Sequence, residues 1–169
     1  AEGEFTVQAS ATDDAGNTAT ATLTATIDMA APSLIIDPID ITNDNSPTVT
    51  GSTDVGVGTI VLLTVTDSDG VEYNLSAVVQ ADGSWSSDLP ILPDGSVTVE
   101  AQVLDDSGNI VNVSATGTID TADPGITLDT FVDTNDVQPT ISGTSDELGA
   151  NVEIVLVDGL GVEQTLSAT

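Results

Sequence analysis

The sequence has no lysine, arginine, histidine or cysteine among its 169 residues. Without basic side chains, the carboxylates find no side-chain salt-bridge partner within the chain. The lack of cysteine excludes disulfides, thiol catalysis and zinc thiolate sites. Long apolar runs are also missing, because no segment approaches the ~20 consecutive apolar residues that span a bilayer. We therefore expect no direct membrane insertion.

Acidic residues are abundant: 28 Asp and Glu give a formal charge of -28. Yet 39% of the residues are hydrophobic and the mean hydropathy is +0.19, which favours a folded core under an acidic surface over disorder. Such a surface repels nucleic acid and anionic membranes. The partners consistent with it are cations, and divalent metal ions above all.

Catalysis has few candidate groups in this composition. Without His, Lys or Cys, only paired carboxylates remain as acid and base, and nothing in the sequence indicates a cleft. We therefore expect no enzyme. The chain has four aromatic residues, and the phase of the only tryptophan, Trp85, points it to the core. A ligand-binding module for sugars needs exposed aromatic faces, and this function stays the alternative.

An internal repeat of about 92 residues organises the chain. Gly3 to Asp28 align without gaps on Gly95 to Asp120, with twelve of 26 positions identical. The same offset relates Gly51 to Gly143, and an offset of 91 relates Asp67 to Asp158. We predict the end of one repeat at 1–27 (strands F and G), a complete repeat at 28–119, and strands A to D of the next at 120–169.

The complete repeat alternates apolar and polar residues with a period of two, which is typical of strands with one buried face. Turn signals rich in Asp, Asn, Gly and Pro separate about seven such strands. This pattern predicts an all-β fold of tandem immunoglobulin-like β-sandwich repeats. The predicted inward residues are Leu34, Ile36, Val49, Val61, Leu63, Val65, Tyr73, Leu75, Trp85, Leu89, Val97, Val99, Ala101, Val103, Val111, Val113, Ala115 and Ile119.

A row of threonines, Thr20, Thr22 and Thr24, alternates with the apolar face of its strand. We predict that this row points outward. An outward threonine row is compatible with ice or ligand binding, but β-propensity on an exposed strand explains it too. The aligned strand has Asn112 and Ser114 instead, which favours the second explanation.

The acids gather in the predicted loops at both ends of each sandwich, so consecutive repeats bring two acidic ends together. At the first junction we expect Glu2, Asp28 and Asp105 to converge from three chain segments. Carboxylates in a flexible, oxygen-only cluster suit Ca²⁺, which takes six to eight oxygen ligands. The predicted calcium ligands at both junctions and at the adjoining loops are Glu2, Asp28, Asp54, Asp69, Asp94, Asp105, Asp106, Asp120, Asp123 and Asp146.

Any single one of these acids is also explained as a turn residue, because Asp accepts hydrogen bonds from its own turn. The total lack of basic side chains favours the metal interpretation for Glu2, Asp28 and Asp105 together. The segment Asp67-Ser-Asp-Gly70 is similar to the start of an EF-hand loop, but it has no closing Glu and strands flank it, so it is a weak motif.

The linkers Asp28-Met-Ala-Ala-Pro32 and Asp120-Thr-Ala-Asp-Pro124 resemble the joints of bacterial Ig-like repeats, as does the Asp-Xaa-Xaa-Gly-Asn motif at 13–17 and 105–109. So do Asp82-Gly-Ser-Trp85 and Leu92-Pro-Asp-Gly95. The chain departs from the family at Met29-Ala30, where Thr is usual, and at Asp123, where Ala is usual.

This resemblance implies the extender region of a large RTX-type or Bap-like adhesin. Such proteins are exported by type I secretion to the bacterial cell surface and serve adhesion and biofilm formation. It also implies neighbouring repeats as partners, with calcium at the joints stiffening the rod. Independently of the family, the unpaired strand edges of the two partial repeats favour self-association through the truncated ends.

Overall fold

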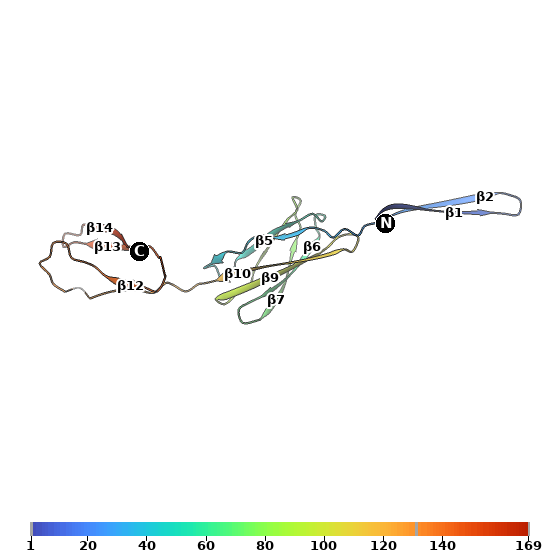
Figure 1. The fold of residues 1–169 in the computed structure, drawn as a ribbon. Coiled ribbons are helices and arrows are strands. Elements are labelled where there is room, and N and C mark those ends of the chain that lie inside the picture. Colours follow the sequence, from blue (N-terminus) through green and yellow to red (C-terminus); the bar gives the residue numbers. More distant parts are fainter. Residues whose placement is uncertain (1, 131, 169) are drawn as a thin grey trace. The chain divides into compact units, whose positions relative to one another are not determined.

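The computed structural model describes residues 2–130 and 132–168, in which 14 β-strands and no helix are present. It divides into two compact units, Ala1–Thr121 and Ala122–Thr169. The first unit contains a long two-stranded ribbon followed by a complete β-sandwich, and the second contains two further strand pairs (Figure 1). None of the described residues forms a helix long and apolar enough to cross a membrane. The predicted repeat boundaries at 27/28 and 119/120 stay predictions.

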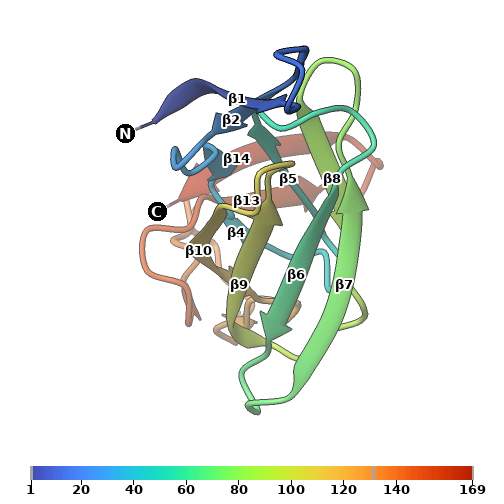
Figure 2. The ribbon, with the colours of Figure 1, turned by 90° about the vertical axis from the view of Figure 1, so that its right-hand side faces the viewer.

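The sandwich in residues 28–119 has two sheets. The three-stranded sheet has the order β3-β5-β8, with β3 at Leu34–Ile36, β5 at Thr48–Thr53 and β8 at Ser84–Asp88. The five-stranded sheet has the order β4-β10-β9-β6-β7, in which β9, β6 and β7 lie side by side (Figure 2). Its strands are β4 (Ile41–Thr42), β6 (Ile60–Thr66), β7 (Glu72–Val78), β9 (Gly95–Leu104) and β10 (Ile110–Ile119).

The predicted all-β, immunoglobulin-like architecture is confirmed, with one difference in strand count. Residues 28–119, all of which the structure describes, form eight strands rather than seven. The first strand is divided: β3 pairs antiparallel with β5, whereas β4 pairs in parallel with β10 in the other sheet. Pro38 lies between the two pieces and has no N–H to donate, so the ladder breaks there and the chain changes sheets.

The core lies between the two sheets and follows the predicted alternation. In β9, Val97, Val99, Ala101 and Val103 are buried while the residues between them are not. Ile36, Tyr73, Leu75, Val111 and Val113 are partly buried and pack against this core. Three core residues were not predicted, because they lie at a strand end or in loops between strands: Ala77, Val79 and Leu92.

Trp85 is the largest buried side chain, with 1% of its surface exposed. Its indole Nε1 has no hydrogen-bond partner in the described part of the chain. An unpaired buried donor costs about 1–3 kcal/mol. Burying ~200 Å² of indole surface contributes about 5 kcal/mol at ~25 cal/mol per Å², so the packing of the ring outweighs the missing hydrogen bond.

The ribbon before the sandwich consists of β1 (Gly3–Thr12) and β2 (Thr18–Ile27). Its register, from Gly3 opposite Ile27 to Thr12 opposite Thr18, matches that of β9 and β10 at the repeat offset of 92. The threonine row is exposed, as predicted. The apolar face is exposed too: Val7 is 51% exposed, whereas its equivalent Val99 is 0% exposed. The hairpin therefore has the register of β9 and β10, but the face that is buried in β9 and β10 is exposed in it.

The second unit repeats the first half of the sandwich. β11 (Ile126–Leu128) pairs with β12 (Gly143–Ser145) as β3 pairs with β5, and β13 (Val152–Val157) pairs with β14 (Glu163–Ala168) as β6 pairs with β7. In both units a glycine allows the first pair to form. A Cβ at Gly51 would overlap the carbonyl oxygen of Ile35, and one at Gly143 would overlap that of Thr127.

Gly51→Ala should destabilise the sandwich by about 1–3 kcal/mol, because the added methyl group overlaps both the Trp85 ring and the Ile35 carbonyl oxygen. Urea unfolding followed by the fluorescence of Trp85, the only tryptophan, measures this loss. The control is Gly56→Ala, where a Cβ meets nothing within 4 Å. A Gly51→Ala variant as stable as the control would contradict the packing described here.

Candidate metal-binding junctions

Several loop aspartates accept hydrogen bonds from the backbone of their own turn. Asp105 Oδ1 accepts from the N–H groups of Ser107 (2.9 Å) and Asn109 (2.8 Å). The same pattern, with donors two and four residues further on, occurs at Asp13, Asp67 and Asp158. In every repeat, backbone N–H groups therefore stabilise these carboxylates, and each such aspartate has a structural role as a turn residue.

Hydrogen bonds also lower the pKa of Asp105 below the ordinary aspartate value of 3.8. The side-chain amide of Asn109 is the largest cause, since its Nδ2 donates to Asp105 Oδ2 at 2.9 Å. Asn17 lowers the pKa of Asp13 in the same way in the first hairpin. Hydrogen bonds to the charged form stabilise the carboxylate, so these loops hold aspartate in its anionic state, the form that ligates a metal.

The first junction brings the linker and the loop after β9 together. Ser107 Oγ donates to Asp28 Oδ2 at 3.2 Å, and Asn109 Nδ2 lies 3.3 Å from the backbone oxygen of Asp28. Because Asn109 Nδ2 also bonds Asp105, one amide group bridges the two acidic residues. Two of the three predicted segments, those of Asp28 and Asp105, therefore meet. The third residue, Glu2, is exposed.

At the other end of the sandwich, Asp94 contacts the second linker. Its Oδ1 accepts from both the N–H (3.0 Å) and the Oγ1 (2.8 Å) of Thr121. The N–H of the preceding residue, Asp120, donates to the backbone oxygen of Thr42 at 2.9 Å. The predicted pair Asp94 and Asp120 thus lies on adjoining segments. Thr121, which was not predicted, connects these segments through its hydroxyl and N–H.

Asp54 and Asp146 were also predicted as calcium ligands. Each accepts a backbone N–H of the first strand region of its own repeat: Asp54 Oδ1 from Ser33 (2.8 Å) and Asp146 Oδ1 from Gly125 (2.7 Å). The two bonds are related by the repeat offset of 92. Both carboxylates therefore attach a loop to the start of the domain, which is a structural role independent of metal.

The remaining predicted ligands, Asp69, Asp106 and Asp123, are exposed. In residues 2–130 and 132–168, no group of three or more acidic side chains lies close enough to hold a metal ion. The convergence of Glu2, Asp28 and Asp105 therefore stays a prediction. The donors that do meet at the first junction are carboxylate and carbonyl oxygens, which is the donor chemistry that Ca²⁺ takes.

Sequence reasoning did not assign a role to Ser107, Asn109 and Thr121, which tie the acids together. Asn109 could have been found, because Asn17 occupies the same place in the earlier repeat and makes the same bond to Asp13. Thr121 gave no such signal, since the first linker has Met29 at that position.

The β-sandwich and its repeated hairpins define an immunoglobulin-like fold, and the comparison with known families agrees. The family described as bacterial Ig-like domain matches residues 37–121. The chain belongs to this bacterial Ig-like domain family.

Among solved structures, the chain is similar to a tetra-tandem repeat in the extending region of a large adhesion protein, with 36% identity and a TM-score of 0.52. The match covers 99% of this chain and 45% of that one. A bacterial ice-binding adhesin (25% identity over 69% of this chain and 41% of that one, TM-score 0.37) and CopC of Methylosinus trichosporium OB3b (29% over 53% and 93%, TM-score 0.41) match more distantly. No curated protein matches the sequence.

Asn109→Ala should raise the pKa of Asp105 toward 3.8, because it removes the largest cause of the lowered value. An aspartate with a lowered folded-state pKa stabilises the fold above its unfolded pKa, and this contribution is lost as the pH falls through the folded pKa. Variant and wild type should therefore differ most in stability above about pH 4 and converge in stronger acid.

Carboxyl ¹³C NMR titration in EDTA measures the pKa of Asp105 directly. The matched control is Asn17→Ala, which should raise the pKa of Asp13 and leave that of Asp105 unchanged. An Asp105 titration that is the same in Asn109→Ala and wild type would show that the amide does not hold this carboxylate.

Proposed function

We propose that this chain is a spacer module of a secreted bacterial cell-surface adhesin, in which consecutive Ig-like repeats form an extender. The observation that carries the proposal is the serial repetition of one domain, down to single hydrogen bonds such as those of Asp54 and Asp146. The similarity to the extending region of a large adhesion protein over 99% of this chain supports it. Export by type I secretion and a role of an RTX-type adhesin in biofilm formation belong to the same proposal.

Calcium at the domain junctions is the second part of this proposal. Two like charges ~6 Å apart repel each other by about 0.7–3 kcal/mol at effective dielectric constants of ~80 to ~20. The chain has no basic residue to offset this repulsion. A calcium ion between Asp28 and Asp105 would replace the neutral Asn109 amide as the bridge, with Glu2 or Asp106 as further ligands. At the second junction, the ligands would come from Asp94, Asp120, Asp123, Asp146 and Asp69.

The expected stabilisation is moderate. Extracellular calcium modules have dissociation constants of ~10⁻⁴ to 10⁻³ M. At ~10 mM calcium, such a site stabilises the folded state by about 1.4–2.7 kcal/mol. For a domain of this size, that corresponds to a rise of the thermal midpoint by roughly 6–20 °C.

Calcium should therefore raise the thermal midpoint of the wild-type chain and abolish motion at the linker. The Asp28→Ala variant should lose most of this calcium-dependent rise in the thermal midpoint. Calorimetry in calcium and in EDTA gives the rise for each variant, so that the hydrogen bonds of Asp28 to Ala30 and Ser107 cancel in the difference. Small-angle scattering of the same samples should show a larger maximum dimension in calcium.

The matched control is Asp40→Ala, which removes one exposed carboxylate outside the predicted ligand set. It should retain the wild-type response to calcium. A maximum dimension unchanged by calcium, or equal responses of the Asp28 and Asp40 variants, would refute calcium bridging and leave the spacer architecture in place.

The alternative function is a carbohydrate-binding module built on aromatic stacking. In the described residues, Phe5 is an exposed aromatic ring (42%), and it occupies the position of the core residue Val97 in the β1–β2 hairpin. Trp85 is buried, as its phase predicted, and Tyr73 is partly buried with its hydroxyl donating to Asp67 Oδ2 at 3.1 Å. Phe131 lies outside the described residues. The sandwich at residues 28–119 therefore offers no exposed aromatic ring on which a sugar could stack, and the spacer proposal assigns the chain no catalytic role.

Self-association is a further part of the proposal. The β1–β2 hairpin corresponds to β9 and β10, and the second unit corresponds to β3 through β7. In the complete repeat, β9 packs beside β6 and β10 beside β3. The second unit of another copy can therefore cover the apolar face of the hairpin, which includes Val7 and Leu23.

Sedimentation velocity over a concentration series should show association of the wild-type chain. Val7→Glu places a charge on the apolar face of the hairpin and should abolish association, whereas Thr22→Glu adds the same charge to the opposite face and should not. A chain that stays monomeric throughout, or equal effects of the two substitutions, would refute this pairing.

A further inference from the structure

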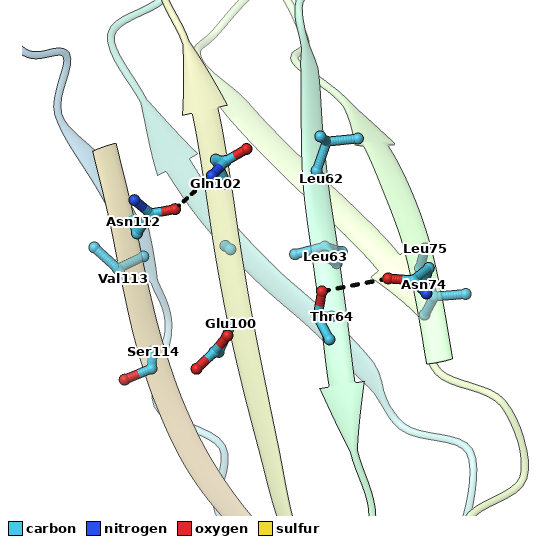
Figure 3. Close-up of a pocket in the computed structure, with 11 residues that line it drawn as sticks. Leu62, Leu63, Thr64, Asn74, Leu75, Glu100, Gln102, Asn112, Val113 and Ser114 are labelled. Atoms are coloured by element: carbon cyan, nitrogen blue, oxygen red, sulfur yellow. Dashed lines mark hydrogen bonds between the residues drawn. The ribbon is translucent and has the colours of Figure 1, made fainter. Parts of the chain in front are cut away.

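The outer face of the five-stranded sheet carries a hollow of about 430 Å³ that runs across the strands (Figure 3). The register places Thr64, Glu100 and Ser114 side by side along one wall. Gln102 and Asn112 are neighbours along the other wall. Between the two rows lies a row of residues that point to the core, so the floor of this transverse groove is backbone.

The polar groups of the groove are only partly used. Gln102 Nε2 donates to Asn112 Oδ1 at 2.7 Å, and Thr64 Oγ1 to Asn74 Oδ1 at 3.4 Å. The amide nitrogens of Asn74 and Asn112 remain as donors and Gln102 Oε1 as an acceptor. Among the residues that the structure describes, none hydrogen-bonds to the carboxylate of Glu100, whose backbone lies in the ladder between β6 and β10. The groove therefore offers donors, acceptors and one uncompensated negative charge.

An aliphatic row borders this groove toward the loop at Asp105. It consists of two cross-strand pairs, Ile60 opposite Val78 on β6 and β7, and Leu104 opposite Ile110 on β9 and β10. Both pairs lie two residues beyond Leu62 and Gln102, which face each other across β6 and β9. Each residue of the two pairs is 46–53% exposed. Paired apolar side chains at the same end of neighbouring strands form a surface patch, and such patches mark interaction sites more often than single exposed residues do.

The fold itself does not require this aliphatic row. At the repeat offset of 92, Leu104 and Ile110 correspond to Thr12 and Thr18, which form the equivalent cross-strand pair and share a hydrogen bond of 2.9 Å. At the offset of 91, Ile60 corresponds to Asn151. At these three positions the flanking segments have polar residues, so the fold does not require aliphatic side chains there.

We propose that the groove and the aliphatic row together bind an extended segment of another protein that carries alternating basic and aliphatic residues. The groove crosses four strands, or about 14 Å at ~4.8 Å per strand, which matches four to five extended residues. A lysine or arginine of the segment pairs with Glu100, its backbone bonds the free amides, and its aliphatic side chains pack on Leu104 and Ile110.

Charge complementarity selects this occupant over a second copy of the chain. The groove and its surroundings are acidic, with Glu100 inside it and Asp105 and Asp106 beyond the aliphatic row. A second copy has no basic residue to place against Glu100 in this groove, so a copy seated there would leave that charge uncompensated. A basic partner gains from the same field, which also speeds its encounter with the groove.

The test uses the hexapeptide Lys-Leu-Lys-Leu-Lys-Leu as the probe, titrated into the 169-residue chain by calorimetry in EDTA at physiological ionic strength. The double variant Leu104→Thr/Ile110→Thr copies the natural Thr12 and Thr18 pair, so it keeps a pairing that this fold already contains. It should weaken binding about tenfold through lost apolar burial. Glu100→Gln should weaken binding up to about fivefold.

Two controls separate this site from general attraction to an acidic protein. Asp40→Asn removes one charge outside the groove and should change the affinity less than about twofold. Lys-Ser-Lys-Ser-Lys-Ser has the same charge as the probe and should bind much more weakly. In NMR spectra, the probe should shift the side-chain amide signals of Asn74, Gln102 and Asn112.

Absence of binding by the Lys-Leu peptide overturns the proposal. So does an affinity that is unchanged in the double variant, since the attraction would then be electrostatic only. If a neutral glucan oligosaccharide shifts the amide signals of the groove and the peptide does not, the groove is a carbohydrate site and the protein-segment proposal is wrong.

Discussion

Every carboxylate of this chain has to be accommodated without a basic side chain. For part of them the structure does this with backbone N–H groups: Asp13, Asp67, Asp105 and Asp158 each accept two of them within a single turn. Such bonds stabilise the anion locally, but they leave its charge in place. The acidic ends of the repeats therefore remain electrostatically unbalanced, and this imbalance motivates both the calcium bridges and the basic partner that we propose.

The repetition extends below the level of the fold. Asp37 Oδ2 accepts a hydrogen bond from Thr50 Oγ1, and Asp129 Oδ2 accepts one from Ser142 Oγ, each at 2.6 Å. The two pairs are related by the offset of 92. These hydrogen bonds recur in the sandwich and in the second unit, which has fewer strands. They therefore depend on the local sequence more than on the rest of the sandwich. In a repeat array, where each unit contacts only its neighbours, this local determination allows one domain design to be used many times.

Some of the differences between the repeats lie on the surface. The pair Leu104 and Ile110 replaces the threonine pair of the first hairpin without a change of register. Linker residues vary as well, since Thr121 binds Asp94 through its hydroxyl and N–H, whereas Met29 has no hydroxyl to offer. A spacer array can thus carry individual contacts on single repeats while the register of its strands stays the same.

The strands, their inward face and the repeat could be predicted from the sequence alone. Period-two alternation and self-similarity are properties of the order of residues and need no knowledge of tertiary contacts. Val97 to Val103 and Trp85 were predicted as core residues for this reason, and the turn aspartates follow from local hydrogen bonding. Which segments meet depended on the tertiary structure: the division of the first strand at Pro38, the bridge from Asn109 to Asp28, and the pairing of Leu62 with Gln102. These depend on contacts between residues far apart in the chain, whose register no local pattern specifies.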